Sequence, residues 1–357
     1  MSSSKPHFIN HFPGRELIID GIPHRYFGGT SYLGLQTDET FQDLFISNVK
    51  RYGTNYGASR KSNIQISIFE EAENYLANLV GSEACTTLSS GYLAGQIIAQ
   101  SLHSKQHQFF YAPNTHSALY QTKTRPYTTF AALNIAVREH LSSKKNTSLP
   151  VVFLDAIDFS GCNYPDFEAL QTLPLNELIL VVDDSHGIGI IGEQGGGVFK
   201  TLLSTGAKEL LVCCSLGKGY GIQAGAIFGT KQRIKELTQT PFFGGASPAA
   251  PAAMATLRDA KDIYEAKREL LKNHIAHFLS HLKKPELLHF MADHPAFTFS
   301  NAQLTEYLAL HHIIVTNFPY PDNNAQLMSR AVLSAHHLKE DIDELAHRFN
   351  EAHKNYA

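Results

Sequence analysis

Cysteine is scarce in this chain, and long apolar runs and a strong net charge are absent. Four cysteines among 357 residues, with no Cys-x-x-Cys spacing, are too few for a disulfide scaffold. We expect all four to be reduced and buried: Cys85, Cys162, Cys213 and Cys214. The net charge is only −3 and the basic residues are scattered, which argues against nucleic acid or an anionic membrane as a partner.

Membrane-directing segments are also lacking. No stretch approaches the roughly 20 apolar residues that span a bilayer. The segment from Met1 to Pro13 has no apolar core between a basic stretch and a cleavage site, as a secretory signal would. We therefore expect a cytoplasmic protein that acts on small neutral or anionic metabolites.

Short apolar runs alternate with stretches of helical period through the middle of the chain. The runs are typical of buried parallel strands: Phe109 to Tyr111, Val151 to Leu154, Leu178 to Val182, Leu210 to Cys214 and Ala226 to Phe228. The helical stretches include Ile68 to Val80 and Gly91 to Leu102. This alternation predicts an α/β fold with a mostly parallel sheet and flanking helices, in which ligands collect at the carboxyl ends of the strands.

Two residues at predicted strand ends answer the needs of one cofactor. Lys218 lies in the glycine-rich segment Ser215 to Gly221, just after one apolar run, and Asp183 directly follows another. An amine among glycines can form a Schiff base, and a carboxylate can keep a pyridinium nitrogen protonated. Neither residue is informative alone, but together they predict pyridoxal 5′-phosphate (PLP), with no metal ion in the site.

Three further positions fit such a site. Ser89-Ser90-Gly91-Tyr92 precedes a helical stretch, so the N–H groups of its first turn could hold a phosphate; an ordinary serine cap is the alternative. His116 follows the run that ends at Tyr111 and could stack on a flat ring. Arg330 interrupts a strand pattern; it suits a substrate carboxylate, and equally an edge-strand charge that faces water.

A competing motif, Gly187-Ile188-Gly189-Ile190-Ile191-Gly192, matches the dinucleotide pattern G-x-G-x-x-G. That pattern requires a helix to begin within it and an acid near the end of the next strand. The following Gly195-Gly196-Gly197 disfavours a helix, and the next predicted strand ends in Cys213-Cys214-Ser215. We therefore do not expect a nucleotide site here.

The successive motifs resemble those of the α-oxoamine synthases, within the aspartate-aminotransferase-like fold type I of PLP enzymes. The resemblance runs from about Gly14 to His347. Its motifs, in order, are Tyr32-Leu33-Gly34-Leu35, Tyr52-Gly53-Thr54, Ser59-Arg60, Gly81-Ser82-Glu83-Ala84, Ser89-Ser90-Gly91-Tyr92, Val182-Asp183-Asp184-Ser185-His186-Gly187, Gly192-Glu193-Gln194-Gly195 and Gly217-Lys218-Gly219-Tyr220-Gly221.

The resemblance implies a role for each matching residue. Lys218 would form the Schiff base, Asp183 would bind the pyridine nitrogen, His116 would stack on the ring and His186 would lie by the phenolic oxygen. The phosphate would be held by Ser90, Gly91, Tyr92 and Ser215, and Arg330 would bind the amino-acid carboxylate. The family forms homodimers in which a Thr or Ser reaches the partner's phosphate, and Ser247 or backbone amides of the segment Phe243 to Pro248 would take that role here. Asp158 stands where the family has a serine.

The resemblance also implies a division of the chain and a reaction. We expect an N-terminal arm over residues 1–45, a large PLP domain over 46–245, and a linking helix with a small C-terminal α/β domain over 246–357. The break at Pro241 to Pro251 precedes a long helical pattern from Ala252 to about Leu282.

The expected reaction is decarboxylative condensation of alanine or glycine with an acyl-CoA or acyl-carrier thioester, which gives an α-oxoamine. The motifs are closest to the biotin-pathway member of the family, and the member that uses glycine and acetyl-CoA is similar. An aminotransferase of the same fold is the nearest alternative. A nucleotide-binding protein and a non-catalytic scaffold explain fewer of the residues.

Overall fold

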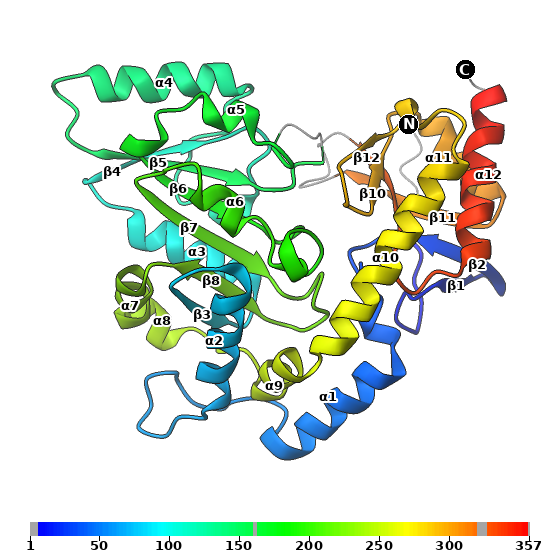
Figure 1. The fold of residues 1–357 in the computed structure, drawn as a ribbon, viewed down its shortest axis with the longest axis horizontal. Coiled ribbons are helices and arrows are strands. Elements are labelled where there is room, and N and C mark those ends of the chain that lie inside the picture. The colour runs from blue at the N-terminus through cyan, green and yellow to red at the C-terminus, as the bar shows by residue number, and fades with distance from the viewer. Residues whose placement is uncertain (1–5, 160–162, 320–326, 356–357) are drawn as a thin grey trace. The chain divides into compact units, whose positions relative to one another are not determined.

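A computed structural model describes residues 6–159, 163–319 and 327–355 of the chain (Figure 1). These residues divide into two compact units. The larger unit holds most of the chain from Asp43 to Lys261. The smaller holds the residues up to Gln42 and from Asp262 onward, together with Phe159. The larger unit extends to Lys261.

The larger unit is built on a six-stranded sheet in the order β3-β8-β7-β6-β5-β4. Its strands are β3 (Ala84–Leu88), β4 (His107–Tyr111), β5 (Leu149–Asp155), β6 (Ile179–Asp183), β7 (Glu209–Ser215) and β8 (Gly225–Gly229). The helices of this unit are α2 (Ile68–Val80), α3 (Gly91–Leu102), α4 (Phe130–Ser142), α5 (Glu168–Gln171), α6 (Phe199–Leu203), α7 (Lys231–Gln239), α8 (Pro241–Gly245) and α9 (Pro251–Asp259); α1 (Glu39–Tyr52) begins in the smaller unit and ends in the larger.

The strands expected in the larger unit, and the helices expected at Ile68 to Val80 and Gly91 to Leu102, are confirmed with one correction. All five apolar runs lie in strands, apart from Leu178, which precedes β6, and the strands from β4 to β7 are parallel neighbours. The run from Ala226 to Phe228 was expected in a parallel strand, but β8 is antiparallel to both of its neighbours. The physical reason is the connection from Leu216 to Ala224, which is shorter than the dozen or more residues that a parallel crossover needs.

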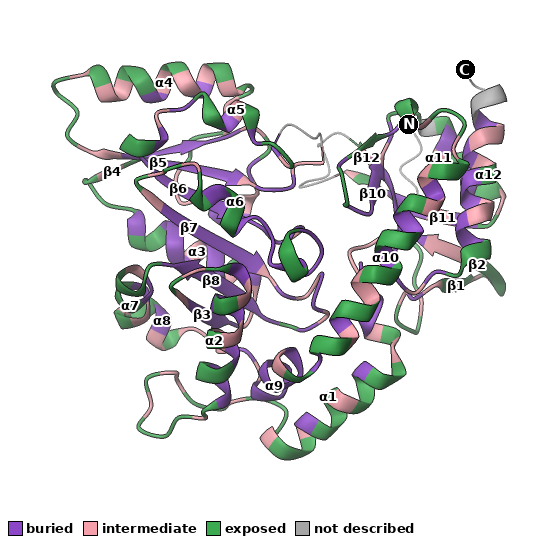
Figure 2. Cartoon of the chain, viewed as in Figure 1, coloured by how far each residue is buried: buried purple, intermediate pink, exposed green. Residues whose placement is uncertain are grey.

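The core of the larger unit lies in and against this sheet (Figure 2). All five residues of β6 are buried, because both faces of the sheet are covered. On one face, Ile97 and Ile98 of α3 pack with Phe153, Val181 and other side chains of the central strands. This packing holds the strand ends at fixed positions.

The smaller unit has its own six-stranded sheet, in the order β1-β2-β11-β12-β10-β9. Its strands are β1 (Glu16–Ile19), β2 (Ile22–Phe27), β9 (His289–Phe290), β10 (Ala296–Thr298), β11 (Ile313–Pro319) and β12 (Leu327–Val332). All neighbouring pairs are antiparallel except β2 and β11. The helices of this unit are α10 (Lys261–His281), α11 (Ala302–Leu310) and α12 (Lys339–Asn355).

The long helix expected from Ala252 to about Leu282 is two helices, α9 and α10. Ala260 separates them, with φ −89° and ψ 21°. This break between the helices falls where the larger unit ends, at Lys261. The apolar pattern of the sequence does not indicate the break.

Two other expectations concern the state of the cysteines and the presence of membrane-spanning helices. The described cysteines, Cys85, Cys213 and Cys214, are buried and form no disulfide, as expected, and Cys162 lies outside the described residues. Among the helices that the structure describes, none is both long and apolar enough to cross a membrane.

Candidate active site

The carboxyl ends of β5, β6 and β7 bring acidic and hydroxyl side chains to one edge of the sheet. In the parallel register Asp155 lies opposite Asp183, and Asp183 lies opposite Cys213, two residues before Ser215. Asp183 is only 8% exposed, and its Oδ1 accepts the N–H of Ser185 at 2.8 Å. A buried carboxylate at the end of the central strand can therefore meet a ligand bound at this edge.

Lys218 and His186 come from different strand-end loops and are in direct contact. Lys218 lies three residues after the end of β7, and His186 lies three residues after the end of β6. The lysine Nζ is 2.8 Å from Nε2 of the imidazole, and both residues are partly buried. The amine is thus held by a side chain that can exchange a proton with it.

The glycine motif from Gly187 to Gly192 packs against the lysine loop instead of starting a helix. These residues form turns, followed by the short 3₁₀-helix η4 (Glu193–Gly195). Gly189 has φ +84°, and a Cβ on it would lie 3.1 Å from the backbone of Gly219. The glycines therefore allow two backbones to meet, and the segment lacks the helix that a dinucleotide site requires.

The N-terminus of α3 lies directly against the end of β7. Ser90 caps this helix, because its Oγ accepts the N–H of Leu93 at 3.2 Å. A Cβ on Gly91 would lie only 2.7 Å from Cα of Ser215, so glycine is required there for the two segments to approach so closely. Ser215 in turn is tied to the β6 loop, because its N–H donates to Oγ of Ser185 at 2.8 Å.

The segment that contains Ser247 also lies at the start of α3. The carbonyl of Ser247 accepts the N–H of Ser89 at 3.1 Å, which places residue 247 beside the start of α3. Tyr92, in the first turn, is 57% exposed. First-turn N–H groups have no partner within the helix and favour anions, so the serine cap and an anion site are compatible readings of the same segment.

His116 is fixed by two hydrogen bonds before the 3₁₀-helix η2 (Ser117–Leu119). Its Nδ1 accepts the N–H of Ala118 at 3.1 Å, so the neutral ring carries its proton on Nε2. The backbone N–H of His116 donates to Oδ1 of Asp155 at 2.9 Å. Burial lowers the pKa of His116; the charge of Asp183 opposes this effect and that of Lys218 adds to it. The imidazole is therefore neutral near pH 7.

Asp155 is a site residue that the sequence reasoning missed. Burial and then the charge of Asp183 raise its pKa well above the usual range, although the bond from the His116 N–H opposes them. A protonated Asp155 places less negative charge beside Asp183. The signal was in the sequence, because Asp155 follows the run ending at Leu154 just as Asp183 follows its own run.

Asp158 belongs to the larger unit and Arg330 to the smaller one. The charge of Asp158 contributes to the raised pKa of Asp155. Arg330 lies on β12, between β11 and β10, and is only 6% exposed. Its guanidinium carbon is 4.0 Å from the ring centroid of Phe159. The reading of Arg330 as a water-facing charge on an edge strand is therefore excluded.

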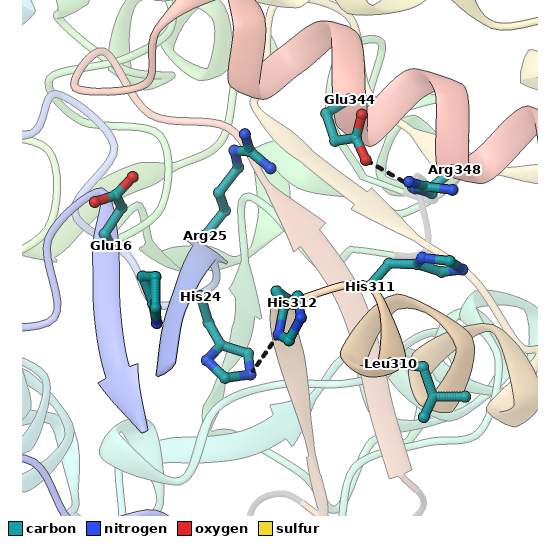
Figure 3. Close-up of a pocket in the computed structure, with 9 residues that line it drawn as sticks. Glu16, His24, Arg25, Leu310, His311, His312, Glu344 and Arg348 are labelled. Atoms are coloured by element: carbon teal, nitrogen blue, oxygen red, sulfur yellow. Dashed lines mark hydrogen bonds and ion pairs between the residues drawn. The ribbon is translucent and has the colours of Figure 1, made fainter. Parts of the chain in front are cut away.

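A pocket of about 400 Å³ also lies in the smaller unit (Figure 3). Its lining includes Arg25, the contacting rings of His24 and His312 (3.4 Å between nitrogens), and the ion pair of Arg348 with Glu344 at 2.8 Å. Both signs of charge line it, and none of the residues predicted to hold the cofactor does.

The fold and the strand-end site define the class of protein: PLP-dependent enzymes of fold type I. The family model "Aminotransferase class I and II" matches residues 160–349, more than half of the chain. The chain belongs to the aminotransferase class I and II family.

Known proteins similar to this chain include members of the narrower group that the sequence motifs resemble. The 8-amino-7-oxononanoate synthase of Cronobacter sakazakii is 26% identical over 93% of this chain and 90% of that protein. The serine palmitoyltransferase of S. paucimobilis, solved with a PLP–myriocin aldimine, matches with a TM-score of 0.75 at 18% identity, over 97% of this chain and 91% of that one. The 8-amino-7-oxononanoate synthase of Francisella tularensis matches with a TM-score of 0.69 at 18% identity, over 93% and 98%.

Proposed function

We propose that the chain binds PLP at the carboxyl edge of its larger sheet, through Lys218. One observation carries the proposal. The Lys218 amine, the buried Asp183 carboxylate and the N-terminus of α3 belong to three separate segments, and all three lie at this edge of the sheet. The close approach of Gly91 to Ser215 fits a phosphate cradle, because it brings the first turn of α3 beside Ser215. These groups meet the three requirements of PLP: an amine for its aldehyde, an acid for its ring nitrogen and hydrogen-bond donors for its phosphate.

Lys218, Asp183 and the first turn of α3 would hold PLP, which would supply an electron sink for negative charge at the α-carbon of a bound amino acid. Asp183 would keep a proton on the ring nitrogen, and the neutral imidazole of His116 would cover the ring without adding charge. Once displaced by the substrate, the amine of Lys218 would take the α-proton. His186 would hold that amine in place through the Nζ–Nε2 hydrogen bond of 2.8 Å.

The proposed reaction is decarboxylative condensation of alanine or glycine with an acyl thioester, to give an α-oxoamine, carbon dioxide and a free thiol. The 8-amino-7-oxononanoate synthase names among the relatives favour an activity of that kind. Arg330 would hold the amino-acid carboxylate. We further propose a homodimer, with Ser247 contributing to the partner's phosphate site.

Replacement of Lys218 tests this assignment. Borohydride treatment of the PLP-loaded wild type should attach a pyridoxyl label to the peptide that contains Lys218, and Lys218→Ala should lose both the label and turnover. Turnover is measured as thiol release from a panel of acyl thioesters with alanine or glycine. A Lys208→Ala variant is the control, because Lys208 is a lysine of the same unit, one residue before β7, and should leave both readouts unchanged.

Each other outcome has a definite meaning. A labelled wild type that releases no thiol but forms pyruvate from alanine with a keto-acid acceptor would replace condensation by transamination. An unlabelled wild type, or an active Lys218→Ala variant, would refute the PLP assignment itself.

A further inference from the structure

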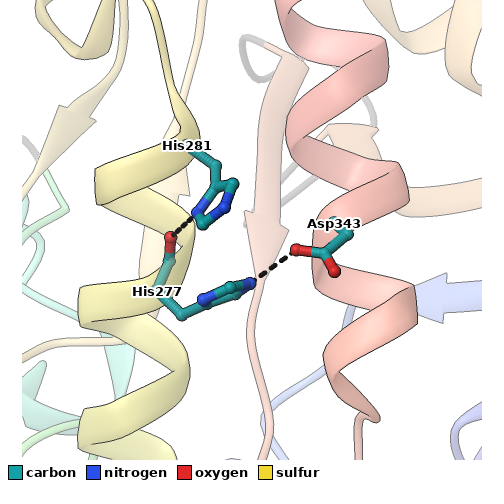
Figure 4. A group of neighbouring side chains, drawn as sticks. All are labelled: His277, His281 and Asp343. Carbon is teal, nitrogen blue, oxygen red and sulfur yellow. Dashed lines mark hydrogen bonds and ion pairs between the residues drawn. The ribbon is translucent and has the colours of Figure 1, made fainter.

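Two histidines and an aspartate of the smaller unit form a cluster that the proposed reaction does not use. His277 and His281 lie one turn apart on α10, and Asp343 faces them from α12 (Figure 4). One nitrogen or oxygen from each side chain lies within 4.8 Å of the other two. All three residues belong to the same compact unit, so the packing of α10 and α12 within it determines their spacing.

The backbone orients one imidazole as a metal ligand. Nδ1 of His281 is 2.9 Å from the carbonyl oxygen of His277. A carbonyl only accepts hydrogen bonds, so Nδ1 carries the proton and Nε2 of the neutral ring presents a lone pair. Metal-binding histidines commonly have their second ring nitrogen held in this way by a carbonyl or carboxylate.

The other imidazole is hydrogen-bonded to the carboxylate. Nε2 of His277 is 2.5 Å from Oδ1 of Asp343. The His277 and Asp343 side chains are 20% and 45% exposed, so an ion from solvent can reach them. Binding of a divalent cation between this nitrogen and the carboxylate would release the proton of the hydrogen bond and would require the two atoms to separate enough to admit the ion.

We propose that His277, His281 and Asp343 bind one divalent transition-metal ion of the zinc type. Two imidazole nitrogens and one carboxylate oxygen are ligands that zinc prefers, and water can complete a tetrahedron at this exposed position. Calcium and magnesium are disfavoured, because they select all-oxygen sites. The ion would join α10 to α12 and would therefore stabilise the smaller unit. This site is independent of the PLP assignment.

Cobalt(II) and zinc titrations of PLP-loaded protein, freed of any affinity tag and treated with a chelating resin, test the proposal. Cobalt should bind one ion per chain with visible absorption bands typical of nitrogen and oxygen ligands, and zinc should raise the Tm by a few degrees. His281→Ala should weaken cobalt binding by at least about tenfold, since even the loss of an outer partner of a metal ligand has an effect of that size.

His347→Ala is the matched control. His347 is an exposed histidine of α12, its side chain is 57% exposed, and it pairs with Glu351 at 3.4 Å outside the cluster. His281 is also exposed, so its replacement should leave the circular dichroism and the PLP absorbance unchanged. Equal cobalt affinities of the two variants would overturn the proposal, as would a wild type that binds no ion at millimolar cobalt. In either case the cluster would be an ordinary histidine–aspartate hydrogen bond.

Discussion

At the scale of single residues, Asp184 differs sharply from its neighbour Asp183. Asp184 is 1% exposed, and its Oδ2 accepts the N–H of Val198 at 3.0 Å. Burial raises the pKa of Asp184 to about 8, against the opposing effect of that hydrogen bond. Near neutral pH this carboxyl is therefore protonated, and its role is to hold the loop after β6 in place.

Replacement of Asp184 by asparagine should change how stability depends on pH. The unfolded carboxyl ionises near its ordinary pKa of 3.8, whereas the folded one ionises at about 8. Between these values the unfolded chain binds fewer protons, so this residue makes the free energy of unfolding fall as pH rises. Asp184→Asn keeps an acceptor for Val198 but cannot ionise, so it should lose this decline.

Urea unfolding of the wild type and Asp184→Asn at about pH 5, 6.5 and 8 measures the difference. The variant should gain stability relative to the wild type at each step toward higher pH, by up to about 1.4 kcal/mol for each pH unit. A constant difference between the two proteins would show that Asp184 is already ionised at pH 5.

At the scale of secondary-structure elements, the site depends on how closely α3 approaches β7. The first turn of α3 contacts the end of β7 at Gly91 and Ser215, and no side chain separates the two backbones. The helix is amphipathic only in part, because seven of its twelve residues are buried. Its burial against the sheet, and not its serine cap alone, determines where the first-turn N–H groups lie.

Gly91→Ala should therefore weaken both stability and cofactor binding. A Cβ would lie 2.7 Å from atoms of Ser215, so the helix or the strand end must shift. Overpacking of this kind costs about 1–3 kcal/mol. Urea unfolding measures the cost, and titration of the apoprotein with PLP, followed by absorbance, measures the change in affinity.

Gly57→Ala is the control for this substitution. Gly57 is exposed, and a Cβ on it would meet only Oδ1 of Asn55, at 4.0 Å. We expect this variant to match the wild type in both measurements. A Gly91→Ala protein with unchanged PLP affinity would contradict the role assigned to the start of α3.

At the scale of the whole molecule, each unit has its own response to pH. In the smaller unit, segments from both ends of the chain meet at buried histidines. His337 is 3% exposed; its Nδ1 accepts the N–H of Ser334 at 3.0 Å, and its Nε2 lies 2.9 Å from the carbonyl of Tyr26. Burial lowers the pKa of His337 to about 3 and that of His336 to about 4.

The smaller unit should therefore lose stability in acid. Below about pH 6.5 the unfolded histidines bind protons while the folded ones remain neutral, so the free energy of unfolding falls with pH down to about pH 4. Hydrogen exchange at about pH 7 and pH 5, corrected for intrinsic rates, measures this change. Amides of β2 and β12 should lose protection relative to those of β6, and equal losses in both units would contradict the expectation.

The sequence allowed much of the fold and site to be predicted because the relevant signals are local. The apolar runs gave five of the six strands of the larger sheet, since a strand buried on both faces is mostly apolar; β3, which contains Thr86 and Thr87, carries a weaker signal. Asp183 was found because it directly follows such a run, and Lys218 because it lies in the glycine-rich segment that follows another. The break between α9 and α10 at Ala260 was not predictable, because the apolar period continues across it.

Asp155 shows where local reasoning stops. A single acid after a strand is usually a turn residue, and its importance becomes visible only when the register sets it opposite Asp183. Its raised pKa arises from burial and from that neighbour, and neither is present in the unfolded chain. The antiparallel direction of β8 was missed, but a local feature of the sequence accounts for it. The connection before β8 is too short for a parallel crossover, so the strand can pair only in the antiparallel direction.

By itself, then, the sequence determined which segments are buried strands and which chemical groups end them, because these properties depend on residues next to one another. Only the tertiary structure decided which groups meet. The Lys218–His186 contact joins residues 32 apart, and the His277–Asp343 contact joins residues 66 apart. Such contacts depend on strand order and helix packing, which bring distant segments together and remove their side chains from water.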